Sequence, residues 1–352
     1  MNHIVSMLSE GPEKMTSHKH TVEAPSNIAF IKYWGVRDAE RCLPRNPSLS
    51  MTLDHCVSTC TAEPIDAEED EIWLAEPNGG FRAPRPSFAD PIRRHLGRLR
   101  AAFDLPKGTG ALRIATRNNF PSAAGLASSA SGFAALTLAA SAALGRTLTT
   151  KDASLLARRS GSGSACRSVL GGYVEWQDPG SDDESYARQI APADHWDLRD
   201  VIAVVEIGEK SVSSRSGHQL AETSPYFEQR LARLPHRHDA VRRAIADRDF
   251  AALGPRIEEE AIDLHLIAMS SSPPIFYWSP GTLSVLRAVR ELRQEGLAAY
   301  ATLDAGANVH VICEAESEAD VAERLEELES VGFVIRDGVG SGPELSGVEH
   351  LY

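Results

Sequence analysis

Residues 119–132 form a glycine- and serine-rich segment that leads directly into a long apolar run. The segment reads Asn-Phe-Pro-Ser-Ala-Ala-Gly-Leu-Ala-Ser-Ser-Ala-Ser-Gly, and residues 133–144 behind it are mostly alanine and leucine without any charge. This composition predicts a helix that is apolar on nearly every side and is therefore buried. Glycine and serine at its start would leave backbone N–H groups free and add hydroxyl donors, which a helix start uses to hold a phosphate.

The same residues fit a second interpretation, and they exclude a third. Because Gly/Ser-rich turns are common, the segment could simply precede a small-residue helix that packs in a core without any ligand. A Walker A loop is excluded, since no Gly-Lys-Ser/Thr follows the glycine.

The composition is that of a globular protein with two domains of ordinary size: 352 residues, 42% apolar and 24% charged. No apolar stretch resembles a membrane span of about 18 residues, and no signal-peptide core precedes a cleavage site, so we expect a cytoplasmic protein. The five cysteines are scattered without any C-x-x-C pair, which favours reduced thiols. A formal net charge of −13 argues against nucleic acid or an anionic membrane as partner. A phosphate ligand would therefore need cations gathered locally.

We expect an N-terminal domain at residues 19–195, after a loose leader at residues 1–18 in which Met15 could be an alternative start. Alternating or β-prone stretches predict strands near residues 22–35, interrupted by Pro25, near 51–62, from 72, and near 111–117. Helices are expected near residues 92–103, 133–144 and 150–159.

A C-terminal domain is expected at residues 196–352. Its strands are predicted at residues 201–207, 299–303, 308–314 and 333–336, and its helices at about 225–269, 280–294 and 317–330. Ser279 and Pro280 are a good N-cap and first helical residue, and Gly296 closes that helix. The order strand, helices, strand, strand, helix, strand is the split βαβ arrangement.

Three charged residues stand where a charge needs an explanation. Lys32 lies in an apolar stretch, so its ammonium either meets an anion or reaches to water. Arg167 follows a Gly/Ser loop at residues 160–164 and offers a planar fork for carboxylate or phosphate, although such a loop could also be a flexible hairpin. Asp304 lies in a turn between two strands, where the residues alone favour a turn-former over a base aimed into a cleft.

Other conspicuous residues have simpler interpretations. His265 is expected to pack at a helix interface rather than to bind a ligand. Residues 338–342 imitate a phosphate loop, but no helix follows them, so they predict a turn in the tail. Residues 182–184 are an acidic run that we interpret as a solvated loop rather than a metal site.

Four segments resemble motifs of one family, in the family's order. The segment at residues 119–132 resembles the Pro-x-x-x-Gly-Leu-x-Ser-Ser-Ala motif with which the GHMP kinase superfamily clamps ATP. Residues 24–35, Ala-Pro-Ser-Asn-Ile-Ala-Phe-Ile-Lys-Tyr-Trp-Gly, are similar to the N-terminal signature of the mevalonate diphosphate decarboxylases, a branch of that superfamily. Residues 160–176 and 302–310 resemble two further motifs of the same branch. The resemblance spans roughly residues 22 to 340.

The resemblance implies an α+β, two-domain GHMP kinase fold. Its N-terminal α/β domain would be ribosomal protein S5 domain 2-like, its C-terminal domain a ferredoxin-like split βαβ, and its active site would lie in the cleft between them. The implied activity is ATP-dependent decarboxylation of a mevalonate phosphate in isoprenoid biosynthesis, with ATP and Mg²⁺ as cofactors. The 3-hydroxyl would be phosphorylated, and phosphate and CO2 would then leave together. Dimerisation is common in such enzymes, so a homodimer is a further expectation.

The resemblance also assigns roles to residues. Asp304 would orient or deprotonate the 3-hydroxyl, Asn27 would help to hold Asp304 and this hydroxyl, Lys32 would neutralise phosphate charge, and Arg167 would bind the departing carboxylate. The residues at the substrate's 5-phosphate end would be Tyr33, Ser162, Ser164, Ser214 and Arg215. The ATP-binding residues would be Ser122, Gly125, Ser128 and Ser129. Mg²⁺ would be held largely by ATP oxygens, with Ser129 as the candidate protein ligand.

Two departures from the family pattern bear on the substrate. Val36 stands where the family commonly has a second lysine that touches the diphosphate, and Ala307 stands where proline is usual. Both look closer to the phosphomevalonate decarboxylase branch, so we expect mevalonate 5-phosphate as substrate. Mevalonate 5-diphosphate is the alternative, with Arg37 or Arg45 replacing the lysine. More remote alternatives are a mevalonate 3-kinase that stops before decarboxylation and a non-catalytic nucleotide-binding protein.

Overall fold

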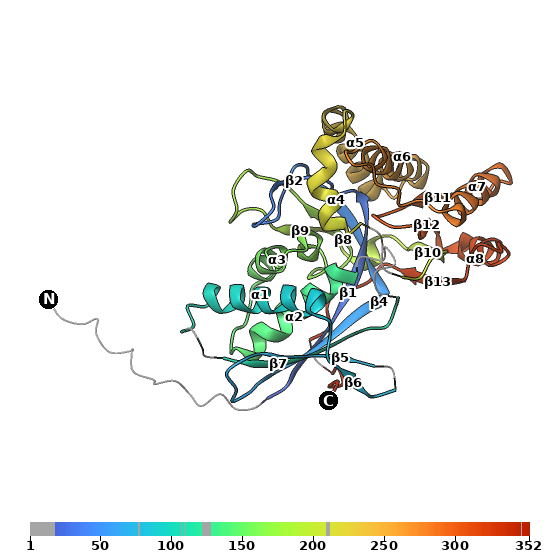
Figure 1. Cartoon of the computed structure of the whole chain (residues 1–352). Helices are drawn as coiled ribbons and strands as arrows, with labels where there is room; N and C mark the ends of the chain where they lie inside the picture. The colour runs from blue at the N-terminus through green and yellow to red at the C-terminus, as the bar shows by residue number, and fades with distance from the viewer. Residues whose placement is uncertain are drawn as a thin grey trace.

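The computed structural model describes residues 18–352 except 77, 107, 109, 122–127, 209–211 and 346. The leader expected at residues 1–18 therefore lies almost entirely outside the described residues. Two β-sheets with their helices dominate the described part (Figure 1).

The first sheet is mixed and is built around one long strand. Strand β4 (Ser48–Pro64) pairs antiparallel with β1 (His20–Ile31), β7 (Leu112–Asn118) and β8 (Tyr173–Trp176). The sheet continues through β5 (Glu71–Ala75), which runs parallel to β7, and ends at β6 (Phe81–Arg82) and β9 (Ala187–Ala191). A separate short hairpin joins β2 (Val36–Asp38) to β3 (Leu43–Pro44).

Helices α1 (Pro86–Ala102), α2 (Ser128–Ala143) and α3 (Thr150–Arg158) cover the first sheet with one shared core. Helix α2 is buried along nearly its whole length, as its alanine-rich sequence predicts. It begins at Ser128, inside the glycine- and serine-rich segment at residues 119–132 and earlier than the predicted residue 133, while its predicted burial is confirmed.

The second sheet is antiparallel in the order β11-β12-β10-β13, formed by β10 (Leu198–Val204), β11 (Ala299–Thr302), β12 (Val309–Glu314) and β13 (Phe333–Gly338). This is the strand order of a ferredoxin-like split βαβ, as predicted. Helices α7 (Pro280–Gln294) and α8 (Glu318–Glu326) pack on one of its faces. The predicted cap of α7 is confirmed, because Ser279 Oγ accepts from Thr282 N–H.

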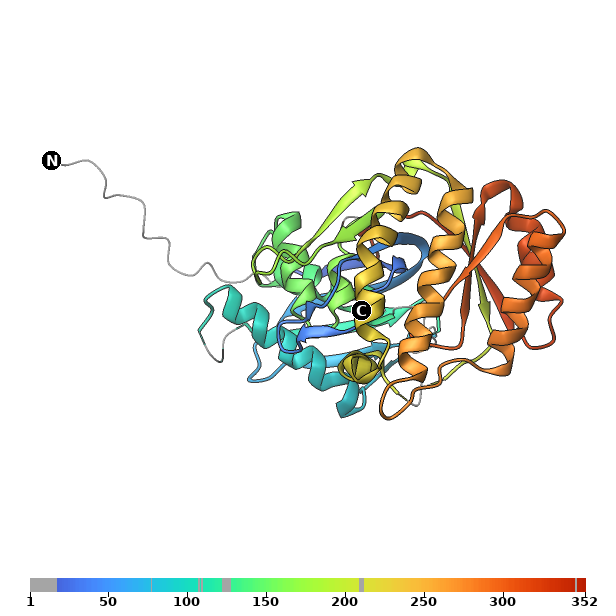
Figure 2. The same ribbon diagram turned by 90° about the horizontal axis from the view of Figure 1, so that it is seen from above.

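The other face of the second sheet shares a core with the first sheet. This core combines Ile28, Phe30 and Met51 with Ile202 and Ile312 from the second sheet, together with residues of α5 (Phe227–Asp247) and α6 (Phe250–Met269). Helix α5 contacts β1, and α6 contacts both β1 and β11, so the two helices, yellow to orange in Figure 2, lie across the junction of the two sheets. Short elements complete the fold: α4 (Ser214–Leu220), η1 (Gly163–Cys166), η2 (Ala193–His195), η3 (Ala221–Thr223) and η4 (Ala315–Ser317).

The structure corrects several predicted element boundaries. Strand β1 is not interrupted at Pro25; instead the pairing with β4 shifts register between Pro25 and Asn27, because proline has no N–H for the ladder. Helix α1 begins at Pro86 rather than near residue 92, since proline is well suited to the first helical position. Helix α8 ends at Glu326 instead of 330, and Ser317 makes no capping hydrogen bond.

The tail after β13 returns to the first sheet. Gly340 donates its N–H to the Thr52 carbonyl at 2.9 Å and accepts from Gly172 N–H at 2.8 Å. A Cβ on Gly340 would lie 2.1 Å from the Leu53 carbonyl oxygen, so the tail packs too closely there for a ligand. The prediction of a turn in the tail is wrong: Gly338 ends β13, Val339 forms an isolated bridge with Leu53, and Gly340 bonds to Thr52, so the segment continues along β4.

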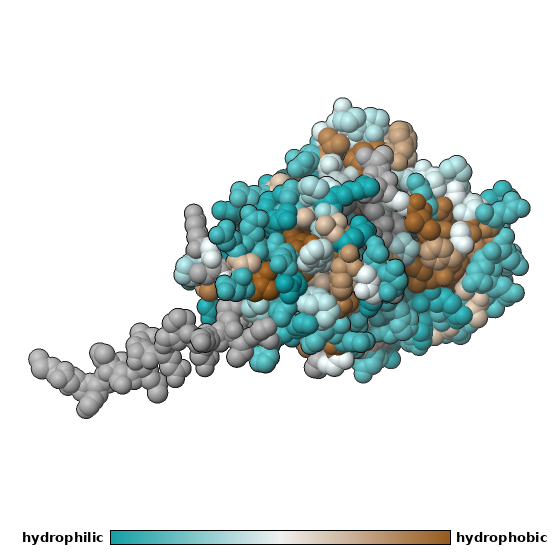
Figure 3. All heavy atoms as spheres, turned by 60° about the horizontal axis from the view of Figure 1, so that its bottom comes forward, coloured by the Kyte–Doolittle hydropathy of each residue, from teal (hydrophilic) through white to brown (hydrophobic). Residues whose placement is uncertain are grey.

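Apolar side chains also reach the surface, and Figure 3 shows hydrophobic patches within a largely hydrophilic face. A pocket of about 190 Å³ lies between α6, α7 and β11, where Trp278 and Leu286 are among its lining residues. Each predicted site residue that the structure describes lies outside this lining. Among the described residues, no helix is both long and apolar enough to cross a membrane.

His95 of α1 makes the fold sensitive to acid. The side chain is fully buried, its Nε2 lies 2.8 Å from Thr137 Oγ1, and burial lowers its pKa from 6.5 to about 3. The unfolded chain therefore binds a proton that the folded chain does not, so this contribution to stability is complete above pH 6.5 and is lost as the pH falls toward about 3.

We expect His95→Gln to flatten this dependence. Between pH 6.5 and about 4.5, the wild type should lose about 2 kcal/mol more unfolding free energy than the variant, measured by urea denaturation. The exposed His236 of α5 provides the control. Equal pH slopes for the wild type, His95→Gln and His236→Gln would contradict this assignment.

Candidate active site

Asp304 and Lys32 form an ion pair between the two halves of the chain. Asp304 follows β11 and Lys32 follows β1, and the Lys32 Nζ donates to Asp304 Oδ1 at 2.8 Å. The lysine side chain is 1% exposed and the carboxylate 25%. Burial alone would raise the pKa of Asp304, but Lys32, with help from His310 and Arg167, holds it below its usual value. The carboxylate is thus kept ionised in a largely enclosed place.

The turn at Asp304 serves both interpretations that the sequence left open. Its backbone carbonyl accepts from Gly306 N–H at 2.8 Å, so the residue does form the turn. Its side chain nevertheless leaves the turn and reaches the buried lysine. The alternative in which the Lys32 ammonium reaches to water is therefore wrong.

Arg167 is a buried cation that neutral groups hold in place. Its guanidinium donates to Ser48 Oγ at 2.5 Å, to Ser50 Oγ at 3.0 Å, and to Asn27 Oδ1 at 3.0 and 3.2 Å. The residue is 2% exposed, burial lowers its pKa, and among the described residues it forms no ion pair. Because a buried unpaired charge is costly, this site favours an incoming anion.

Asn27 differs from its expected role. Besides accepting from Arg167, it donates its Nδ2 to Ser168 Oγ at 2.7 Å. Its hydrogen bonds therefore orient the Arg167 guanidinium rather than Asp304. A contact of Asn27 with a substrate hydroxyl stays a prediction.

The Gly/Ser loop at residues 160–164, called the serine loop below, lies against the start of α2. Ser129 Oγ is 3.2 Å from Ser162 Oγ, which in turn lies 3.5 Å from Ser164 Oγ. Ser128 begins α2, whose first turn contains no acidic residue, so the helix start remains suited to an anion. Ser122 and Gly125 lie outside the described residues.

Two glycines bring further predicted residues to this loop. Gly161 has φ +103°, and a Cβ there would lie 3.6 Å from the Arg215 guanidinium. A Cβ on Gly163 would lie 2.8 Å from the Tyr33 ring, so this ring also packs on the loop. Ser214 is the first residue of α4 and the chain neighbour of Arg215. The residue before it, Ser213, caps the helix with its hydroxyl.

Sequence reasoning missed three residues of this region. Ser48 and Ser50 alternate on β4, and this spacing of two on an apolar strand was a usable signal for side chains on one face. His218 of α4 had no such signal: its Nδ1 accepts from Gly35 N–H at 3.1 Å, and its ring centroid lies 4.1 Å from that of Tyr33. Desolvation and repulsion by Arg230 lower its pKa to about 3, so the ring is neutral.

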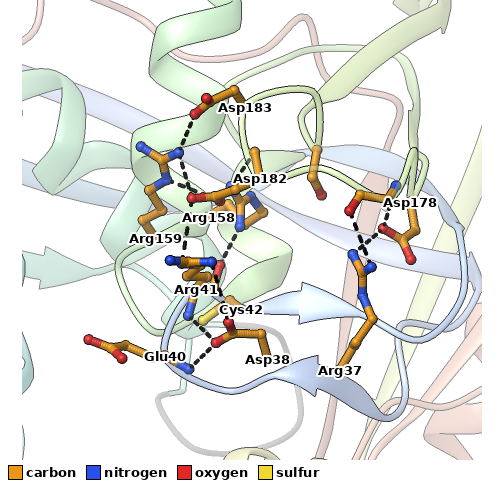
Figure 4. Close-up of polar contacts among 12 residues, drawn as sticks. Arg37, Asp38, Glu40, Arg41, Cys42, Arg158, Arg159, Asp178, Asp182 and Asp183 are labelled. Carbon is orange, nitrogen blue, oxygen red and sulfur yellow. Dashed lines mark hydrogen bonds and ion pairs between the residues drawn. The ribbon is translucent and has the colours of Figure 1, made fainter.

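Arg37 and Arg45, the candidates for replacing the missing lysine, are both engaged elsewhere. Arg37 donates to Asp178 Oδ1 at 2.9 Å and to the Gly180 carbonyl at 3.2 Å (Figure 4). Arg45 forms ion pairs of 3.1 Å with both Glu222 and Glu228.

The acidic run at residues 182–184 is more than a solvated loop. Asp182 accepts from the fully buried Arg158 and from Arg159, which also pairs with Asp183 at 2.8 Å (Figure 4). Arg158 in turn donates to the Arg41 carbonyl, so this loop anchors the β2–β3 hairpin to the end of α3. No group of three His, Cys, Asp or Glu side chains in the described chain could hold a metal ion.

His265 packs as predicted, buried on α6 with its ring 5.2 Å from that of Trp278. The five cysteines are all free and buried.

Comparison with known proteins identifies the family of both halves. The diphosphomevalonate decarboxylase-like N-terminal domain matches residues 24–187, and the mevalonate 5-diphosphate decarboxylase C-terminal domain matches residues 200–337. A diphosphomevalonate decarboxylase of Ganoderma lucidum is 39% identical over 334 residues, which cover 88% of this chain and 82% of that protein.

Solved structures agree with this result. The mevalonate diphosphate decarboxylase from Enterococcus faecalis is 36% identical with a TM-score of 0.84, over 93% of this chain and 98% of that one. A structure of MDDEF in complex with MVAPP, AMPPCP and magnesium is 37% identical, with the same coverage and TM-score. The α+β, two-domain GHMP kinase fold is thereby confirmed, while the boundary at residues 195 and 196 stays a prediction.

These comparisons overturn the expectation of mevalonate 5-phosphate as substrate, because both the family model and the relatives are named for the diphosphate. The two departures were poor indicators. The carbonyl of Ala307 accepts from Thr282 Oγ1 at 2.6 Å, so this residue fits the start of α7. The absence of a lysine at Val36 does not show how many phosphates the substrate carries, because other donors can bind them. With both halves matched, the chain belongs to the diphosphomevalonate decarboxylase family.

Proposed function

We propose that this protein catalyses the ATP-dependent decarboxylation of mevalonate 5-diphosphate to isopentenyl diphosphate. Family membership makes it a carboxy-lyase. The observation that carries the specific proposal is the pairing of Asp304 with Lys32 close to Arg167, a buried cation whose hydrogen-bond partners among the described residues are neutral. Such a site combines a base for an alcohol with a receptor for a carboxylate.

The start of α2 suits the phosphates of ATP. The hydroxyl of Ser129 and the backbone N–H groups at the start of α2 would be donors, and the first turn of the helix contains no acidic side chain. Ser129 would be the protein ligand of Mg²⁺, and the ATP-binding roles expected of Ser122 and Gly125 stay predictions. AMPPCP, an ATP analogue, and magnesium are both present in the related complex. Bound Mg-ATP would supply the γ-phosphoryl group that the substrate's 3-hydroxyl attacks.

Asp304 would bind the 3-hydroxyl and accept its proton as the oxygen attacks phosphorus. Its lowered pKa keeps it ionised at neutral pH, and the Lys32 ammonium balances negative charge beside it. Alignment and charge neutralisation are the main requirements of phosphoryl transfer, so a fixed pair of this kind suits the step.

Arg167 would bind the substrate's carboxylate. When the C3–O bond to the new phosphate breaks, the C1–C2 bond also breaks, and its electron pair forms the C2=C3 double bond while CO2 leaves. The hydrogen bonds from Asn27, Ser48 and Ser50 fix the guanidinium, which would align the breaking C–C bond with the departing phosphate.

The diphosphate would lie at the serine loop. Arg215 lies against Gly161, and Tyr33 against Gly163, and these would bind the diphosphate together with Ser162, Ser164 and Ser214. Since Arg37 and Arg45 are held by carboxylates, Arg215 is the cation that we assign to this end. A homodimer and a cytoplasmic location are further predictions that accompany the family.

The decisive assay compares substrates and products. We expect purified protein with Mg-ATP to release ADP and CO2 in equal amounts from mevalonate 5-diphosphate, with kcat/KM at least about tenfold above that for mevalonate 5-phosphate. ADP without CO2 would instead indicate a 3-kinase. Nucleotide binding without turnover of either substrate would indicate a non-catalytic protein.

Asp304→Asn tests the proposed base. The amide has nearly the same shape but cannot accept the proton, so we expect kcat to fall by about 100-fold or more, while the dissociation constant for ATP changes by less than about threefold. Asp178→Asn removes the carboxylate that holds Arg37 and serves as the control, expected to keep kcat. Undiminished kcat in Asp304→Asn would rule out this role.

A further inference from the structure

The backbone of Lys32 lies just beyond the β-ladder. The last residue of β1 to pair with β4 is Ile31, opposite Leu49, so the N–H and C=O of the next residue have no strand partner. Lys32 is nevertheless 1% exposed. Buried backbone groups need hydrogen bonds, and these must come from outside the sheet.

Helices α5 and α6 supply two of these partners, and Asn46, between β3 and β4, supplies the third. Glu260 Oε1 of α6 accepts the Lys32 N–H at 3.1 Å. The Lys32 carbonyl accepts from Arg230 Nη2 of α5 and from Asn46 Nδ2, each at 2.9 Å. Arg230 also donates to Asn46 Oδ1 at 3.3 Å, so the three groups around this peptide are bonded to one another.

Glu260 is itself fixed by two arginines. Its Oε1 pairs with Arg230 and its Oε2 with Arg237, and all three side chains are at most 3% exposed. Arg237 continues to Glu259 and Asp263, each at 2.8 Å. A carboxylate that is buried from solvent and bonded on both oxygens has little freedom to move, because breaking either ion pair leaves an uncompensated buried charge.

We propose that Glu260 is a positioning residue for the decarboxylation, acting through the backbone of Lys32. The second half of the chain then holds Lys32 at both ends, with Asp304 on the ammonium and Glu260 and Arg230 on the peptide groups. This is feasible because α5 and α6 both pack on β1, whose end precedes Lys32, and α6 also packs on β11, which leads to Asp304. The inference rests on the proposed function, because it assigns the network a role in that reaction.

The decline of kcat/KM at low pH, its acid limb, would reveal this role. Asp304 faces Lys32 after β1, Arg167 after η1, His310 on β12 and His218 on α4. If the Lys32 backbone shifts, its ammonium withdraws from Asp304, and the pKa of Asp304 rises. Since the reaction needs the ionised carboxylate, the acid limb of kcat/KM then moves to higher pH.

The experiment uses the full chain with mevalonate 5-diphosphate and Mg-ATP, and compares Glu260→Gln with Glu258→Gln. Glu258 lies on the same helix and pairs with Arg293 at 3.0 Å, so it is a matched ion pair without contact to Lys32. For Glu260→Gln we expect kcat to fall by about 10- to 100-fold and the acid limb to rise by about 0.5 to 1 pH unit. Glu258→Gln should change neither.

Two further variants distinguish an effect on the position of Lys32 from a loss of stability alone. Arg237→Lys leaves the Glu260 contact to Lys32 but loosens its far side, so the acid limb should move in the same direction by a smaller amount. Should Glu260→Gln fail to fold, Glu260→Asp takes its place, since its shorter side chain keeps the charge but withdraws from the Lys32 N–H.

An acid limb that matches that of Glu258→Gln in every folded Glu260 and Arg237 variant, with only the melting temperature lowered, would overturn the inference alone. A wild-type protein without turnover would instead overturn the proposed function, and this inference with it.

Discussion

The ion pair between Lys32 and Asp304 joins residues 272 positions apart and brings together the ends of strands from both sheets. Neither charge would be stable alone in such an enclosed position, because desolvation penalises each of them. Each therefore depends on the other, and the pair depends on how closely the two sheets approach. The core that the two sheets share with α5 and α6 fixes that approach.

Local charge explains how an acidic chain can bind highly charged anions. With a net charge of −13, the surface as a whole would repel a nucleotide and a diphosphate. Lys32 and Arg167 are buried, where Lys32 pairs with Asp304 of the site itself and Arg167 bonds to neutral groups, whereas the more exposed Arg37 and Arg45 pair with carboxylates outside the site. Burial thus separates the cations that serve the site from those that only hold loops, such as the group around Arg158 and Asp182.

Much of the fold was predictable from local patterns. The alanine-rich run gave α2, the Ser279-Pro280 pair gave the start of α7, and the order of elements gave the split βαβ sheet. The errors at Pro25 and at the start of α1 have a common cause: proline was interpreted as a break, although a register shift or a first helical turn accommodates it. The prediction of a monophosphate substrate was wrong because Val36 and Ala307 say nothing, without their tertiary contacts, about the phosphates that the site binds.

The sequence alone marks Lys32 as unusual, because a lysine in an apolar strand breaks the expected pattern of burial. Arg167 after a glycine–serine loop and Asp304 in a turn are ordinary by local pattern, and the family resemblance singles them out. Their contacts follow from the folded chain: Asp304 meets Lys32, Asn27 orients Arg167, and Glu260 holds the Lys32 backbone. The physical reason is that propensity and periodicity act within a few residues, whereas these contacts exist only once two sheets have packed around a common core.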